Sequence, residues 1–162
     1  MHLTHVGRHP ERAHYDFATI AAILDEAVIC NVGFVTEDQP IVIPTIYGRV
    51  ERSLYIHGSS VARWMNSLGA AIPICVSVSI LDGLVLARSA YHHSLNYRSV
   101  VLLGRADLVV DETEKVAALR AIVEHVCPKR WDDVRQPNKN ELKATRVLRV
   151  DVARASETTE RR

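Results

Sequence analysis

Apolar side chains recur at helical spacing in three stretches of the chain, and each stretch has a signal for where a helix begins or ends. Asp16 can cap the first helix. Asp111 with Glu114 resembles a capping box at the start of the third, which Pro128 ends. Asn138 with Glu141 predicts one further short helical turn. Helices are therefore predicted over 16–27, from about Val61 onward and over 111–127, with apolar positions at Ile20, Ile23, Leu24 and Ala27, at Val61, Trp64, Met65 and Leu68, and at Val116, Leu119, Val123 and Val126.

Other stretches alternate between apolar and polar residues, as half-buried strands do. The segment 36–40 has turn composition and hairpin length, so the strands on either side of it are expected to pair antiparallel. Pro44 cannot donate a hydrogen bond to a ladder, which places it at a sheet edge or at a bulge. The predicted strands are 28–35, 41–47, 54–57, 72–80, 84–91, 97–110 and 147–152, with further turns at 48–53 and 81–83.

Six or seven strands joined mostly by hairpins, together with these helices, predict an α+β fold. It is built on an antiparallel six- to seven-stranded β-barrel with flanking helices. A chain of 162 residues fits a single domain. We expect an N-terminal extension over 1–15, the domain itself over 16–153 and a frayed tail over 154–162.

Composition mainly excludes classes of function. The chain has 20 Lys and Arg against 19 Asp and Glu, and a net charge of +1 does not attract nucleic acid. No apolar run approaches membrane-spanning length and the first residues do not resemble a signal peptide, so we expect a cytoplasmic protein that contacts no membrane. Cys30, Cys75 and Cys127 are odd in number and far apart, which is typical of core residues and not of a disulfide framework or a thiolate metal site.

The first candidate site is the run His57, Gly58, Ser59 and Ser60 between a predicted strand and a predicted helix, with Arg63 in the first turn of that helix. A helix start, a glycine, two hydroxyls and a guanidinium each suit an anion such as phosphate. The other interpretation is that Ser59 or Ser60 caps the helix while Arg63 lies in solvent. Both interpretations stay open on the local sequence.

The second candidate is a polar and aromatic cluster over 89–99. His92 and His93 are adjacent, and because neighbouring side chains on an extended segment diverge, no metal site is expected from this pair unless His57 joins one of them. The other interpretation is a solvated loop with Tyr97 packed on the barrel.

The third candidate is the predicted strand containing Pro44 and Thr45. A proline frees a neighbouring carbonyl group from ordinary pairing, and a threonine adds a hydroxyl, so this strand could hydrogen-bond a flat polar ring. An edge-strand proline also protects against association of sheets, so this signal alone is weak. The sequence contains none of the glycine-rich nucleotide motifs, nucleophile-elbow or zinc-protease motifs.

Four segments together resemble the pyridoxamine 5′-phosphate oxidase-like FMN-binding split-barrel family, in its flavin-nucleotide-binding branch near the nitroimidazole-resistance proteins. They are Ile43 to Thr45, Leu54 to Ser59, Leu81 to Ala90 and His92 to Val101, and the resemblance extends from about Arg8 to Ala155. It implies a split barrel that binds FMN, and a homodimer with the flavin at the subunit interface.

The resemblance also assigns residues to the flavin. It implies that the phosphate lies at the corner from His57 to Arg63 and that the ring lies along Ile43, Pro44 and Thr45. It further implies that Tyr97, Arg98 and Ser99 approach the flavin, often from the partner subunit. True pyridoxamine phosphate oxidases carry R-L-x-D-R and W-x-x-x-R-L-x-P motifs that this chain lacks, so vitamin B6 oxidation is not expected.

The expected function is FMN binding with oxidoreductase chemistry, as a nicotinamide-linked or small-molecule-linked reductase. Two alternatives remain. One is a non-catalytic flavin carrier or sensor, and the other is a haem-binding split-barrel protein with His57, His92 or His93 as axial ligand.

Overall fold

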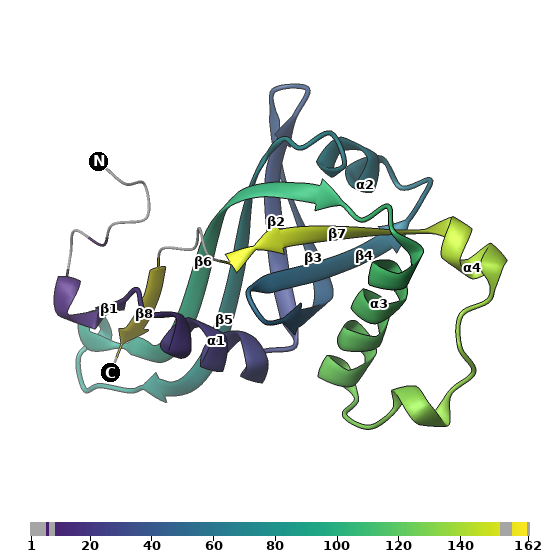
Figure 1. Cartoon of the computed structure of the whole chain (residues 1–162). Coiled ribbons are helices and arrows are strands. Elements are labelled where there is room, and N and C mark those ends of the chain that lie inside the picture. The colour runs from purple at the N-terminus through teal and green to yellow at the C-terminus, as the bar shows by residue number, and fades with distance from the viewer. Residues whose placement is uncertain (1–5, 7–8, 153–156, 162) are drawn as a thin grey trace.

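The computed structural model describes residue 6, residues 9–152 and the backbone of residues 157–161 (Figure 1). Its strands are β1 (Ala13–His14), β2 (Ile29–Thr36), β3 (Gln39–Val50), β4 (Ser53–Ser59), β5 (Pro73–Val85), β6 (Ser94–Leu108), β7 (Thr145–Asp151) and β8 (Glu157–Arg161). Its helices are α1 (Phe17–Glu26), α2 (Arg63–Leu68), α3 (Glu112–Val126) and α4 (Lys139–Ala144), with short 3-10 turns at Pro10–Arg12, Ala90–His92 and Trp131–Asp133. Within this described part of the chain, no helix is both long enough and apolar enough to cross a membrane.

The strands form an antiparallel sheet that closes into a barrel. Hydrogen-bonded neighbours follow the order β2, β3, β4, β7, β6 and β5, and β5 pairs again with β2. β1 and β8 continue the sheet beyond β6, outside this ring. The predicted α+β fold with an antiparallel barrel of six to seven strands is therefore confirmed, and the ring itself has six strands.

The barrel is split between β3 and β4. These two strands pair only where residues 47–50 face residues 53–56. Beyond that point β4 continues along β7, whereas β3 continues along β2. Between Ile41 and Ile46, therefore, the side of β3 that faces away from β2 has no strand partner among the described residues. The sequence predicts Pro44 either at a sheet edge or at a bulge. In the structure it lies on this free edge, where the pairing with β2 is regular.

The hairpin of β2 and β3 has the turn that the sequence predicts. Glu37 and Asp38 occupy its tip with φ of 50° and 59°, and the two strands pair from Thr36 opposite Gln39 onward. The turn predicted over 48–53 is narrower in the structure, because the strands extend to Val50 and resume at Ser53.

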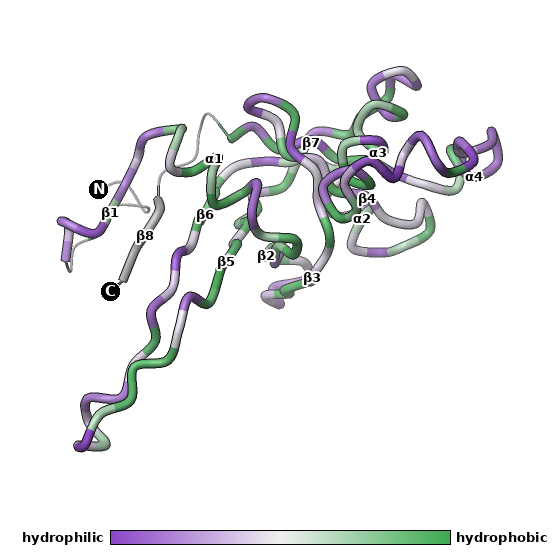
Figure 2. The backbone as a smooth tube through the Cα atoms, turned by 90° about the horizontal axis from the view of Figure 1, so that it is seen from below, coloured by the Kyte–Doolittle hydropathy of each residue, from purple (hydrophilic) through white to green (hydrophobic). Residues whose placement is uncertain are grey.

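The turn predicted at 81–83 is wrong, because β5 runs on to Val85 through a bulge between Leu81 and Gly83. Arg98 on β6 holds the Asp82 carboxylate at this bulge, with nitrogen–oxygen distances of 2.8 to 3.2 Å. Asp82 therefore takes part in a long-range ion pair and does not form a turn. Residues 86–93 make the connection instead, so the strand predicted over 84–91 ends at Val85. Beyond the bulge, β5 and β6 extend as an arm away from the barrel (Figure 2).

Two helices cover different parts of the barrel. α1 contributes Ile20, Ile23 and Leu24 to the main core. α3 packs on the outside of β3, β4 and β7, where Ala118 and Ile122 are buried (Figure 1). This second contact requires the glycine at position 48 of β3, because a Cβ atom there would lie 2.5 Å from the backbone of α3.

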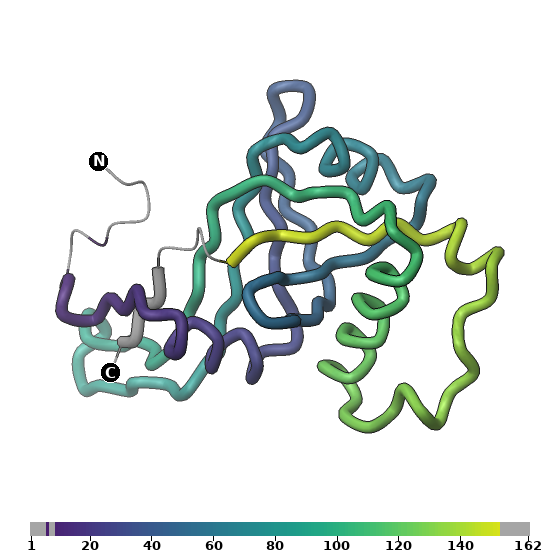
Figure 3. Tube along the Cα trace, in the orientation of Figure 1, coloured from purple at the N-terminus to yellow at the C-terminus, as the bar shows by residue number. Residues whose placement is uncertain are grey.

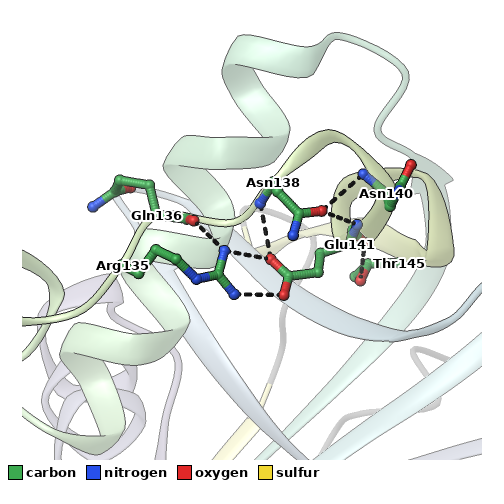
Figure 4. A network of polar contacts seen from close by, with 6 residues as sticks. All are labelled: Arg135, Gln136, Asn138, Asn140, Glu141 and Thr145. Atoms are coloured by element: carbon green, nitrogen blue, oxygen red, sulfur yellow. Dashed lines mark hydrogen bonds and ion pairs between the residues drawn. The ribbon is translucent and has the colours of Figure 1, made fainter.

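Asn138 and Glu141, from which the sequence predicts a short helical turn, form a capping box at the start of α4 (Figure 4). The side-chain oxygen of Asn138 accepts hydrogen bonds from the backbone N–H groups of Asn140 and Glu141, and the Glu141 carboxylate accepts one from the backbone N–H of Asn138 at 2.8 Å. Arg135 donates to the same carboxylate at 2.6 and 3.0 Å, which lowers the pKa of Glu141 to about 2. The cap fixes the start of α4, which leads directly into β7 beside β4.

The frayed tail predicted over 154–162 is wrong for residues 157–161, which form β8 and pair with β1 and β6. Without β8, the outer edge of β6 would expose unpaired backbone groups, and the threonines at 158 and 159 favour a strand. Residues 153–156 and 162, and residues 1–5 and 7–8 of the predicted extension over 1–15, lie outside the described residues.

Candidate functional site

The corner between β4 and α2 is held by backbone hydrogen bonds. The Ser60 N–H donates to the Ala144 carbonyl oxygen at 2.8 Å, and the Ala62 N–H donates to the Ser59 carbonyl oxygen at 3.0 Å. α2 begins at Arg63, later than the predicted start near Val61, and its N-cap residue Ala62 makes no side-chain capping bond. Neither serine caps α2, so that part of the alternative is wrong, although Ser59 Oγ accepts a hydrogen bond from the Val61 N–H at 3.4 Å just before the helix. Val61 is 84% exposed and does not join the apolar face of the helix.

Gly58 lies where α2 packs on β4. A Cβ atom at this position would lie 2.7 Å from Met65 Cγ and 2.9 Å from Trp64 Cζ2. The glycine therefore lets α2 pack directly on β4. This close packing fixes α2, and with it Arg63, against the barrel.

A cleft of about 580 Å³ lies between α2 and the β2–β3 hairpin, which run side by side at one end of the molecule (Figure 3). Arg63 lines the cleft from α2 and Ile43 lines it from β3, so two of the predicted site residues meet here. The Arg63 side chain is exposed, and its guanidinium makes no ion pair or hydrogen bond with the described residues. The full lining is Phe34, Thr36, Glu37, Gln39, Ile41, Ile43, Arg63, Trp64, Asn66 and Ser67.

Most of this lining carries no signal in the sequence. Trp64 was expected on the buried face of α2, yet it is only partly buried and also lines the cleft. Asn66 and Ser67 belong to no sequence motif, and the sequence predicts only a turn over 36–40, which includes the lining residues Thr36, Glu37 and Gln39. No periodic signal marks these residues, because the cleft forms between two elements that are far apart in the sequence.

His57 projects from the opposite face of β4 to Gly58, toward the region that α3 covers. Its Nδ1 atom is buried and has no hydrogen-bond partner among the described residues. Burial lowers the pKa of His57 below its ordinary value, so the ring is neutral near pH 7. His57 does not line the cleft.

Pro44 and Thr45 lie on the free edge of β3, on opposite faces. Pro44 is exposed on the outer face opposite Asn31, while Thr45 is half-buried and donates its hydroxyl hydrogen to the Ile46 carbonyl oxygen at 3.2 Å. These residues adjoin the cleft through Ile43.

Tyr97, Arg98 and Ser99 lie on β6, separated from β3 by β5 and β2, so one chain does not bring them to the cleft. The segment is extended, as predicted, so Tyr97 and Ser99 share one face and Arg98 takes the other. Arg98 donates to the Glu26 carboxylate at 2.6 and 2.7 Å as well as to Asp82. These hydrogen bonds raise the pKa of Arg98 and lower the pKa of both carboxyl groups.

His92 and His93 are exposed in the connection between β5 and β6. The His93 ring nitrogen Nδ1 lies 3.1 Å from the Ser89 carbonyl oxygen, and the His92 ring makes an edge contact with Tyr91. Among the described residues, no group of three or more His, Cys, Asp and Glu side chains could hold a metal ion.

Comparison with known proteins adds three findings. The family model described as pyridoxamine 5′-phosphate oxidase matches residues 16–159. The structure is similar to the flavocytochrome Anf3 from Azotobacter vinelandii, with a TM-score of 0.91 and 41% identity over 100% of this chain and 75% of that chain. It is also similar to the FAD and haem binding protein from Mycobacterium smegmatis, with a TM-score of 0.87 and 29% identity over 92% of this chain and 73% of that one.

A more distant likeness concerns the fold alone. A candidate 5-nitroimidazole antibiotic resistance protein from Bacteroides thetaiotaomicron has a TM-score of 0.72 at 22% identity, over 95% of each chain. The comparison with curated proteins gives no match.

Proposed function

This chain belongs to the pyridoxamine 5′-phosphate oxidase family, and from that premise we propose that it binds a flavin nucleotide at the β4–α2 corner. The phosphate of the FMN moiety lies at Ser59, Ser60 and Arg63, and the ring lies along β3 from Ile43 to Thr45. The FMN moiety is the part that FMN, the predicted cofactor, and FAD have in common.

The split between β3 and β4 carries this proposal. It leaves the backbone groups of β3 between Ile41 and Ile46 without a strand partner, next to the unpaired guanidinium of Arg63. A flat ring with polar edges can hydrogen-bond to free backbone groups, which need partners when they are removed from water. A guanidinium fork and two serine hydroxyls suit the phosphate of the same molecule. The donors present therefore fit the group.

The relatives support the same cofactor class. The Azotobacter protein is named a flavocytochrome, and the Mycobacterium protein is named as binding FAD and haem. Both exceed 25% identity over most of this chain, so their cofactors bear on this one more directly than the cofactors of proteins that share only the fold.

We propose further that the protein is an oxidoreductase, in which the flavin supplies electron transfer. The chain's own residues bind and orient the cofactor, and α2 and β3 shield one side of it from water. A nicotinamide or another small molecule would be the electron donor. A non-catalytic carrier or sensor is the alternative, and a cytoplasmic location stays a prediction of the sequence.

Haem is a second candidate, because both relatives combine a flavin with a haem in their names. His57 has the chemistry of an axial ligand, since it is neutral and its buried Nδ1 lacks a hydrogen-bond partner. The exposed His92 and His93 are the other options.

The visible spectrum of the purified protein tests the proposal, followed by chromatography of the cofactor released on denaturation. Flavin absorption bands strong enough for nearly every site to be filled support the flavin proposal, and a Soret band supports haem binding in addition. Protein that is colourless and takes up neither FMN nor FAD would overturn it. Oxidation of a reduced nicotinamide by the yellow protein separates an enzyme from a carrier.

A further inference from the structure

A second cavity, of about 500 Å³, lies on the face of α3 opposite the one that buries Ala118 and Ile122 against the barrel. The helix lines it, together with one residue from the segment that returns from the end of α3 to α4 (Figure 1). The cavity shares no lining residue with the cleft beside Arg63, so it is separate from the proposed flavin site. Its lining is Glu112, Thr113, Val116, Ala117, Arg120 and Trp131.

Trp131 is buried at this cavity and not in the core of the barrel. It is only 6% exposed, yet it belongs to neither of the two apolar core clusters of the described residues. Its backbone N–H donates to one oxygen of the Glu124 carboxylate at 2.8 Å, and the other oxygen accepts from the backbone N–H of Lys129 at 2.6 Å. Lys129 has a φ of 66°, which residues other than glycine rarely adopt. The returning segment is therefore built to hold a tryptophan beside α3.

The indole N–H of Trp131 makes no hydrogen bond with the described residues. Two polar side-chain atoms of the described chain are fully buried without a partner, His57 Nδ1 and Asn96 Oδ1, and the indole nitrogen is not one of them. This nitrogen therefore reaches solvent, and because the rest of Trp131 is buried and lines the cavity, it opens onto that space. A largely buried indole N–H usually has an acceptor. Here the donor is available to a ligand.

Arg120 is the cation of the lining. Its guanidinium lies 3.5 Å from the carboxylate of Asp132, the residue after Trp131, so it stands next to the turn that carries the tryptophan. Both members of this ion pair are more than half exposed, so the pair contributes little and a better acceptor can displace it. Glu112, which has the opposite charge, lies eight residues earlier on α3, about 12 Å away along the helix axis. The end of the cavity beside Trp131 therefore favours an anion.

We propose that this cavity binds a small carboxylate with an apolar body, such as an aryl or branched aliphatic acid. The carboxylate accepts hydrogen bonds from Arg120 and from the indole N–H of Trp131, and the apolar body covers Val116 and Ala117. A volume of about 500 Å³ is in the range of small-molecule sites. The inference goes beyond the proposed flavin site and does not depend on it.

Proton–nitrogen NMR spectra of the purified protein test this inference. The chain has two tryptophans, Trp64 and Trp131, so the spectrum contains two indole N–H signals, and Trp64→Phe assigns them. The probes are phenylacetate, benzyl alcohol and benzylamine, which share one ring and differ in charge. Phenylacetate should shift the Trp131 signal and leave the Trp64 signal in place. Benzyl alcohol should bind about tenfold or more weakly, since it lacks the charge-assisted hydrogen bonds, and benzylamine should not bind.

Two arginine variants identify the cation. Arg120→Met removes the charge from the cavity and should weaken phenylacetate binding about tenfold or more while leaving flavin affinity unchanged. Arg130→Met removes an equally exposed charge from the residue before Trp131, which does not line the cavity, and should change neither affinity. A Trp131 signal that does not respond to phenylacetate would overturn the inference. Binding of benzylamine or benzyl alcohol as tight as that of phenylacetate, or an equal loss in both variants, would overturn it as well.

Discussion

Three glycines give a graded test of how the barrel positions α2 and α3. Adding a Cβ atom at Gly104 meets nothing within 4 Å, and at Gly58 it meets the flexible side chains of Met65 and Trp64 at 2.7 and 2.9 Å. At Gly48 it meets the backbone of Ala121 and Ile122 at 2.5 Å. None of these glycines has a positive φ, so substitution by alanine tests only whether there is room for a Cβ atom.

The magnitudes follow from what has to move. Carbon atoms normally approach to about 3.5–4.0 Å, so Gly58→Ala requires the side chains on α2 to shift by about 1 Å. Overpacking of this kind costs about 1–3 kcal/mol of unfolding free energy. Gly48→Ala requires the whole of α3 to move, and we expect about 3 kcal/mol or more. Gly104→Ala should be neutral, or should stabilise by up to about 1 kcal/mol by restricting the unfolded chain.

Urea denaturation of the three variants measures this order directly, and flavin titration adds a second readout. Only Gly58→Ala shifts the helix that carries Arg63, so only this variant should weaken flavin binding under conditions where all three are folded. A Gly58→Ala protein as stable as Gly104→Ala, or a Gly48→Ala protein that loses no stability, would refute the packing argument.

Four further predictions concern the site and the assembly. Arg63→Ala should weaken FMN binding about tenfold to a hundredfold, since charge-assisted hydrogen bonds contribute about 1.5–3 kcal/mol, and an unchanged dissociation constant would remove Arg63 from the site. Sedimentation should give a homodimer, and a monomer at micromolar concentration with flavin bound would contradict this. In the folded protein the pKa of His57 is lowered below its ordinary value of 6.5, so as the pH falls the unfolded chain is protonated at a higher pH than the folded one. The contribution of neutral His57 to the unfolding free energy is therefore full above pH 6.5 and is lost as the pH falls below it. From about pH 8 down to about pH 5.5, the unfolding free energy should fall less in His57→Gln than in the wild type. Finally, protein purified without a histidine tag should hold no stoichiometric zinc or non-haem iron that disappears in a His92→Ala, His93→Ala variant.

The elements that the sequence predicts well are those whose signals are local. The Glu37–Asp38 turn and the Asn138 capping box are confirmed because each depends on residues within a few positions of one another. The apparent turn at Asp82 is misleading because Arg98, sixteen positions away, holds Asp82 in a bulge. No local pattern contains that ion pair.

In the candidate site, too, residues with a local sequence signal can be predicted and residues placed by long-range packing cannot. Arg63 and Ile43 could be proposed from sequence, and the structure places both on one cleft. Trp64 and Asn66 could not be, because they become cleft residues only once α2 packs on Gly58 beside the β2–β3 hairpin. The helix start near Val61 was wrong for a related reason, since an exposed valine has the same apolar signature as a buried one.

The two groups of residues that the family resemblance assigns to one flavin are far apart in a single chain. Pro44 and Ser99 lie on the outer face of the sheet, three strand spacings apart, or about 14 Å. Within one chain, β5 and β2 therefore separate Tyr97 and Ser99 from the free edge of β3. The same outer face carries apolar side chains that are more than half exposed, among them Ile29, Val42 and Leu81. A second copy packed on this face would cover them and could bring its own Tyr97 and Ser99 to the split beside Pro44. The dimer and the complete flavin site are therefore a single hypothesis, and a monomer with full flavin affinity would exclude Tyr97 and Ser99 from the site.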